Sequence, residues 1–118
     1  MSKAPAMLRS KSDFAAVGRS DAVRSDARLS ARFVRTERDV TRFGISTGRR
    51  LGGAVVRNRI RRRIREGLRA LGPRIAPGFD ILLVARAASV TASQADLAAT
   101  LERLLRKGGA LREERTEG

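Results

Sequence analysis

The chain contains neither cysteine nor histidine. Without cysteine it can form no disulfide, no zinc–cysteine site and no thiol nucleophile. Without histidine it lacks the commonest general acid or base, the commonest metal ligand and the usual partner of a serine nucleophile. Any catalysis by this polypeptide alone would rest on carboxylates or lysines, and no closely spaced pair of acids stands in an apolar context. We therefore expect no catalytic residue and no metal ligand in this chain.

Aromatic residues and long apolar runs are also scarce. There are four phenylalanines and no tyrosine or tryptophan, so aromatic stacking on nucleobases has few candidates. No run approaches the roughly 18 apolar residues that a membrane-spanning helix needs. The first ten residues lack the apolar core of a secretory signal. These absences predict a cytoplasmic protein that does not bind membranes.

Charge of one sign is abundant. In 118 residues, a length typical of one small domain, 26 lysines and arginines stand against 12 acids, which gives a net charge of +14. Such an excess destabilises a compact chain by self-repulsion. The composition therefore indicates a polyanionic partner.

The arginines concentrate in one segment, where six of the nine residues from Arg57 to Arg65 are arginine. Apolar residues recur at helical spacing through and beyond it, which predicts a helix over 54–71 that ends at Gly72-Pro73. Its buried stripe is Ile60, Ile64, Leu68 and Leu71.

Around that stripe, a dense basic flank carries Asn58, Arg61, Arg62, Arg65 and Arg69, and the opposite flank carries Arg59 and Arg63. Arginines four residues apart repel one another by about 0.2–0.5 kcal/mol per pair. The planar guanidinium suits phosphate, so we interpret the helix as an anion-binding surface. A solvated face and a membrane-surface helix are the alternatives, and the second lacks an exposed apolar face.

Asn58 is open to two interpretations from the sequence alone. Its amide can pair with a base edge, or it can cap the start of the helix.

The remaining segments predict a small α+β sandwich. Residues 12–17 form a short helix with Ser12 as its N-cap, and Phe14 packs beside Val17. Residues 28–35 and 40–47 alternate in polarity and predict two strands in an antiparallel hairpin. Residues 79–85 are apolar throughout, which predicts a central strand. Ser93 to Asp96 has the form of a capping box for a helix over 94–107. The buried stripe of that helix is Leu97, Leu101, Leu104 and Leu105.

Domain boundaries follow from these elements. We expect a flexible basic tail over residues 1–8, one domain over 9–108, and a disordered charged tail over 109–118. A basic helix beside a polar, basic sheet face suits a single strand or a shaped RNA better than a DNA duplex. No helix-turn-helix or zinc-finger pattern is present, so DNA is not an expected partner.

The run from Phe43 to Glu66, FGISTGRRLGGAVVRNRIRRRIRE, resembles the signature of the bacterial ribonuclease P protein subunit. That family has a glycine-x-serine strand, a basic pair, and an alanine-valine-x-arginine-asparagine-arginine run on a helix. The segments 12–17 and 79–86 resemble its first helix and last strand, so the similarity covers roughly residues 9–107. It implies an α-β-β-β-α-β-α fold with an uncommon left-handed βαβ crossover.

The resemblance also implies a function. The family protein assists a catalytic RNA that removes the 5′ leader from precursor tRNA, and the RNA with its Mg²⁺ ions performs the hydrolysis. By this resemblance, and with Arg69 added because it continues the same flank, the residues expected to contact the RNA subunit are Arg57, Asn58, Arg59, Arg61, Arg62, Arg65 and Arg69. Those expected in a cleft for the single-stranded leader are Phe14, Arg32, Ser46, Arg49 and Arg50.

Two positions depart from the family pattern. Gly18 stands where a second aromatic usually follows the first helix, and Arg32 stands where a strand aromatic often faces the cleft. The leader would therefore be held more by charge than by stacking. The free protein is expected to be a monomer that binds no cofactor itself and raises the affinity of the complex for substrate and magnesium.

Two other functions remain open from the sequence. The chain could be a ribosomal or other structural RNA-binding protein, or a self-sufficient nuclease that uses Asp80 or Asp96 with a metal ion. Both aspartates have a structural interpretation, Asp80 as a cap at a strand start and Asp96 as part of the capping box.

Overall fold

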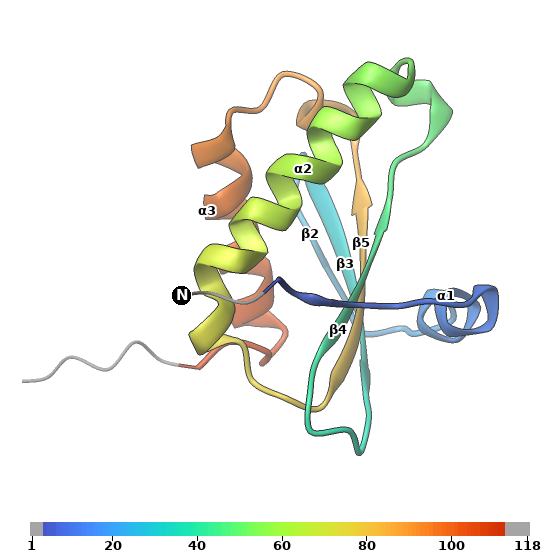
Figure 1. The fold of residues 1–118 in the computed structure, drawn as a ribbon, viewed down its shortest axis with the longest axis vertical. Helices are drawn as coiled ribbons and strands as arrows, with labels where there is room; N and C mark the ends of the chain where they lie inside the picture. The colour runs from blue at the N-terminus through green and yellow to red at the C-terminus, as the bar shows by residue number, and fades with distance from the viewer. Residues whose placement is uncertain (1–3, 113–118) are drawn as a thin grey trace, which may run out of the picture.

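The computed structural model describes residues 4–112, which form one five-stranded sheet with three α-helices (Figure 1). Along the chain the strands are β1 (Ala6–Met7), β2 (Val23–Ser25), β3 (Leu29–Arg35), β4 (Arg42–Ser46) and β5 (Phe79–Ala85). The helices are α1 (Lys11–Gly18), α2 (Ala54–Leu71) and α3 (Gln94–Lys107). Short 3₁₀ turns η1 (Arg49–Leu51), η2 (Gly72–Arg74) and η3 (Ala87–Ser89) join them. No helix in this part of the chain is long and apolar enough to cross a membrane.

The sheet separates α1 from the other two helices. Figure 1 shows α2 and α3 on one side of the strands and α1 on the other. Alternation along β3 follows the predicted pattern, because Leu29, Ala31 and Phe33 are buried while Ser30 and Arg32 are half-buried on the opposite face. The face toward α1 is therefore the polar face of the sheet.

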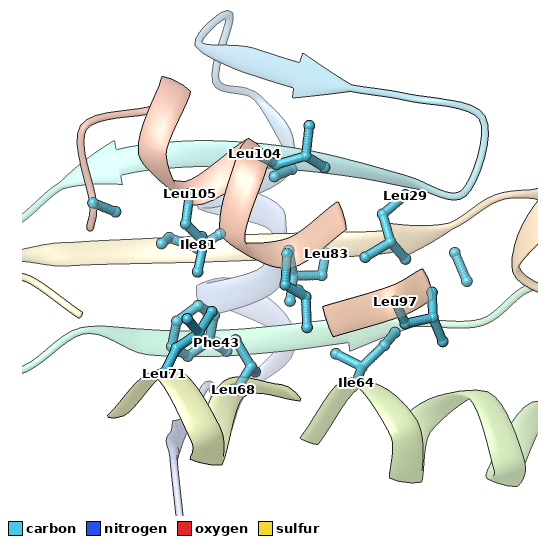
Figure 2. Close-up of a cluster of buried hydrophobic side chains, with 14 of the residues drawn as sticks. Leu29, Phe43, Ile64, Leu68, Leu71, Ile81, Leu83, Leu97, Leu104 and Leu105 are labelled. Carbon is cyan, nitrogen blue, oxygen red and sulfur yellow. The ribbon is translucent and has the colours of Figure 1, made fainter. Parts of the chain in front are cut away.

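The core lies between the sheet and the pair α2 and α3. Figure 2 shows Phe43, Ile81 and Leu83 of the strands meeting Leu68 of α2 and Leu105 of α3. The predicted stripes are confirmed, since all of their members are buried: Ile60, Ile64, Leu68 and Leu71 on α2, and Leu97, Leu101, Leu104 and Leu105 on α3. Burial of each side chain contributes about 1.5–3 kcal/mol, enough to hold a highly charged helix in place.

The strand order is β1-β4-β5-β3-β2, which makes β5 central as predicted. The predicted hairpin between residues 28–35 and 40–47 is wrong, because β5 lies between these strands, antiparallel to β3 and parallel to β4. A strand that is apolar on both faces gains most from burial in the centre of a sheet. This gain outweighs the short connection that would favour a hairpin. β4, α2 and β5 thus form a parallel crossover unit. β2, at the far edge, pairs antiparallel with β3.

Helix caps agree with the sequence for α3 and differ for α1. Ser93 and Asp96 form the predicted capping box. The predicted cap Ser12 of the first helix is wrong, because Ser10 is the N-cap and forms its own capping box with Asp13. The earlier start places the Asp13 carboxylate at the third helical position, where it satisfies the free N–H groups of the cap.

Residues near both limits of the described range pack onto the domain. Residues 6–8 were assigned to a flexible tail, yet Ala6–Met7 pair with β4 and Leu8 is buried. At the other end Ala110 is buried and Leu111 forms a β-bridge with Ile75. The rest of the predicted tail, residues 113–118, lies outside the described residues.

Candidate nucleic-acid interface

The outward face of α2 carries an exposed ridge, defined here as Asn58, Arg62, Arg65 and Arg69. These positions are spaced by three or four residues, so they lie along one side of the helix, away from the buried stripe. In residues 4–112, Arg62, Arg65 and Arg69 form no side-chain hydrogen bond and no ion pair. Three guanidinium groups are therefore free to bind an anion.

Asn58 lies within the helix and does not cap it. The helix begins at Ala54 with Gly53 as its N-cap, so the capping interpretation of Asn58 is wrong. The exposed amide oxygen of Asn58 accepts a hydrogen bond from Arg61 Nη1 at 3.2 Å. The amide NH₂ group has no partner among the described residues and can donate to a ligand.

Arg59 and Arg63 point to the other flank of α2, as the helical pattern predicted. Arg59 Nη2 donates to the carbonyl of Val90 at 3.2 Å, and Arg63 Nη1 donates to the carbonyl of Ala92 at 2.6 Å. Both side chains are half-buried. Arg57 is half-buried as well, and its Nε has no hydrogen-bond partner in the described residues. The predicted RNA-contacting residues thus divide into an exposed group and a partly buried group.

A groove of about 580 Å³ lies where β4 and β5 end, beside η1. Ser46 and Val84 are register partners in the two parallel strands, and both line it. The full lining is Ser46, Gly48, Arg50, Leu51, Val84, Ala85, Arg86, Ala87 and Val90. Two arginines, one from η1 and one from the end of β5, make the groove electropositive.

Two of the five predicted cleft residues, Ser46 and Arg50, line this groove. Arg49 is its exposed neighbour in η1. Arg86 was not predicted to line the cleft. The sequence could have indicated it, because Arg86 directly follows the central strand as Arg49 and Arg50 follow β4. The apolar lining of Val84, Ala87 and Val90 has no such signal in the sequence.

Phe14 and Arg32 lie elsewhere on the α1 side of the sheet. The Phe14 ring rests on Gly44, where a Cβ would come within 2.6 Å of Phe14 Cε2. Arg32 Nη1 donates to the carbonyl of Ser20, in the connection after α1, at 2.6 Å. Gly44 precedes Ser46 by two residues, so Phe14 and the groove share one face of the sheet. Phe33 is buried in the core, where its ring packs edge-on against Phe79.

An ion-pair network fastens α1 to this face. Arg42 binds Asp80 through two bonds, Nε–Oδ1 at 3.0 Å and Nη2–Oδ2 at 2.7 Å, and also contacts Asp13 of α1 at 3.4 Å. The interpretation of Asp80 as a strand cap is therefore wrong. Although desolvation opposes the shift, N–H donors of the α1 cap and the charge of Arg42 lower the pKa of Asp13.

The two aspartates that a self-sufficient nuclease would use have structural partners. Asp80 binds Arg42, and Asp96 caps α3 and lies 3.6 Å from Arg28. Among residues 4–112, no three side chains of the His, Cys, Asp and Glu types lie together as a metal site.

Comparison with known proteins places this chain in a family. The family model described as ribonuclease P matches residues 2–109. The chain is similar to the "Ribonuclease P protein component" of Roseiflexus castenholzii, with 48% identity over 61% of this chain and 60% of that protein, so the match spans less than two thirds of that relative. It is 40% identical to the protein of the same name from Chloroflexus aggregans, over 93% of this chain and 82% of that protein.

The fold agrees with a solved structure. The RNase P protein of Staphylococcus aureus superposes with a TM-score of 0.82 at 25% identity, over 90% of this chain and 97% of that one. The family match covers nearly the whole described chain, and the fold and the relatives agree with it. The chain belongs to the ribonuclease P protein family.

Proposed function

We propose that this protein is the RNA-binding subunit of ribonuclease P and assists a catalytic RNA in removing the 5′ leader from precursor tRNA. The observation that carries the proposal is the exposed ridge on α2, where three arginines that have no partner within residues 4–112 stand beside Asn58. Family membership supplies the identity of the complex.

The ridge is suited to the RNA subunit. Arginine binds phosphate with two parallel N–H donors, and the RNA backbone offers phosphates at a spacing that a helix surface can follow. Binding of this kind releases counterions from the RNA, so affinity falls steeply as salt rises. Asn58 adds a neutral donor among the charges, which can reach a base edge or a ribose.

The groove is suited to the single-stranded leader. Arg50 and Arg86 attract the phosphates, and Val84 and Val90 offer an apolar surface for ribose or base. Phe14 lies farther along the same sheet face, where its half-buried ring could meet a base. Arg49 and Arg32 add positive charge near the proposed path of the leader. The leader is thus held chiefly by charge, as the few aromatic residues suggest.

The chemistry belongs to the RNA and its Mg²⁺ ions in this proposal. A protein with a net charge of +14 neutralises phosphates that would otherwise repel one another, so the folded complex needs less magnesium. The protein supplies substrate affinity and electrostatic relief. We further propose that it acts in the cytoplasm, binds no DNA or membrane, and is a monomer when free.

The test is cleavage of a leader-bearing precursor tRNA at low magnesium, with a bacterial catalytic RNA, with and without this protein. Cleavage that requires the RNA and is strongly stimulated by the protein supports the proposal. Cleavage by the protein alone would reveal a carboxylate–metal nuclease. No stimulation would favour the alternative of a ribosomal or structural RNA-binding protein.

Salt dependence locates the RNA on the protein. Replacing Arg65 by alanine should reduce the slope of log affinity for the catalytic RNA against log salt by about one, because one phosphate contact is lost. Arg38, which is exposed in the turn between β3 and β4, provides the charge-matched control. Equal slopes for the wild type and the Arg65 variant would place the RNA on another surface.

A further inference from the structure

Two arginines of the signature segment donate to backbone carbonyls outside α2. Arg59 and Arg63 are one turn apart on α2, and each donates to a backbone carbonyl in the connection between β5 and α3, Val90 at 3.2 Å and Ala92 at 2.6 Å. In return, Gln94 Nε2 donates to the carbonyl of Arg63 at 2.8 Å. Three hydrogen bonds therefore join one flank of α2 to residues 90–94.

The connection that they hold is itself tightly folded. It contains η3, and Ser89 at its end is fully buried with its hydroxyl donating to the carbonyl of Arg86 at 2.6 Å. Ala92 is also buried. Carbonyls that face α2 from such a connection need donors, and the two guanidinium groups supply them.

The same connection forms a wall of the groove. Arg86, Ala87 and Val90 line it together with Arg50 and Leu51 of η1. Val90 belongs to both arrangements, since its carbonyl accepts from Arg59 and the residue lines the groove. A change at Arg59 therefore reaches the groove through a single residue.

We propose that Arg59 and Arg63 are positioning residues that hold residues 87–92 against α2 and so fix the wall of the groove that receives the leader. They act on the substrate through the protein backbone, whereas Arg62, Arg65 and Arg69 bind the catalytic RNA directly. This inference rests on the proposed function. The arginines of α2 thus have two tasks, and the flank of the helix that a side chain occupies decides which task it has.

The experiment uses the reconstituted complex with Arg59→Met and Arg63→Met, because methionine keeps the aliphatic stem and removes the donors. The affinity is measured for precursor tRNA with its leader and for mature tRNA without it. We expect the ratio of the two affinities to fall by up to about tenfold, the effect of one hydrogen bond from a charged donor. An unchanged ratio would overturn the proposal. Because loss of folding would also lower the ratio, the comparison uses variants whose circular dichroism matches that of the wild type.

Two further variants separate charge from position. Arg62→Met removes the same charge from the exposed ridge, and we expect it to lower the salt slope for the catalytic RNA by about one without changing the leader ratio. Arg63→Lys retains a charged donor and should restore much of the ratio. Arg59→Met and Arg63→Met should leave the salt slope at the wild-type value.

A reduced salt slope with an unchanged leader ratio in the Arg59 and Arg63 variants would show that these side chains bind RNA phosphates, and the inference would be wrong. An unchanged slope in Arg62→Met would instead remove the proposed RNA surface. As a second measurement, hydrogen exchange in the free protein should become faster for the amides of residues 87–92 in Arg63→Met. Unchanged exchange there would contradict the positioning role even if the complex failed to assemble.

Discussion

Removal of Arg42 should destabilise the protein by leaving a carboxylate buried without its partner. Arg42 is the first residue of β4, and its guanidinium binds Asp80 of β5 through two hydrogen bonds of 3.0 and 2.7 Å. The side chains of Arg42 and Asp80 are only 15% and 11% exposed. The substitution Arg42→Met keeps most of the side-chain volume and removes all of the donors.

The expected cost follows from the burial of the pair. Loss of one partner of a buried ion pair costs about 3–5 kcal/mol, because the remaining charge stays desolvated. Loss of the contact with Asp13 adds little to this cost, since Asp13 retains the N–H donors of the α1 cap. We therefore expect Arg42→Met to lower the free energy of unfolding by about 3 kcal/mol, near the lower end of that range, because neither side chain is fully buried. That is a large part of the 5–15 kcal/mol typical of small domains.

Urea unfolding at pH 7, followed by helical circular dichroism, measures this cost. The control is the double variant Arg42→Met/Asp80→Leu, which removes both charges and should lie within about 1 kcal/mol of the wild type or above it. The reasoning is refuted if the double variant is as unstable as Arg42→Met. In that case packing against α1, and not the unpaired carboxylate, would set the cost.

Three further outcomes are expected. Gly44→Ala places a Cβ against the ring of Phe14, so it should cost about 1–3 kcal/mol in urea unfolding and weaken leader binding while affinity for the catalytic RNA is kept. Despite desolvation, N–H donors and hydroxyl and guanidinium partners lower the pKa of Asp26 below its ordinary value of 3.8, so the unfolded state takes up the proton first as pH falls. The stability that Asp26 contributes is thus present above pH 3.8 and lost below it. The free energy of unfolding of Asp26→Asn should therefore fall less than that of the wild type as the pH is lowered through this range. Sulfate should raise the melting temperature more than chloride at equal ionic strength, and equal effects would argue against specific anion sites.

The helices were predictable because their information is local. Residues 54–71 and 94–107 form helices with the expected bounds, since an apolar stripe with period 3.6 and a terminal glycine or capping box define each one. The central position of β5 was predictable for a similar reason, because a strand without a polar face needs cover on both sides.

The strand pairing was not predictable from local pattern. Segments 28–35 and 40–47 have the alternation and the polar turn of a hairpin, and nothing within them shows that a strand from residues 79–85 will lie between them. Similarly, the sequence places Asp80 at a strand start but does not show that Arg42 of the neighbouring strand lies beside it. Such contacts arise only when distant segments meet.

The candidate site shows the same division between local and distant information. Helical spacing alone places Arg59 and Arg63 on a flank opposite to Arg65 and Arg69. The partners of the first two, carbonyls about thirty residues later in the chain, depend on how β5 and α3 are connected. The groove depends on the same connection, which explains why Ser46 and Arg50 were predicted while Val90 was not.

This division also explains how α2 tolerates its charge. The pairs 57/61, 59/63, 61/65 and 65/69 are like charges one turn apart and together cost about 1–2 kcal/mol. In the free protein, hydrogen bonds to the carbonyls of Val90 and Ala92 offset the repulsion between Arg59 and Arg63. The pairs that involve Arg65 have no acidic partner in residues 4–112, so their repulsion persists until an anion binds. The stabilising effect of sulfate should therefore shrink in Arg65→Ala and persist in Arg63→Met. The reverse result would place the anion site on the flank of Arg59 and Arg63.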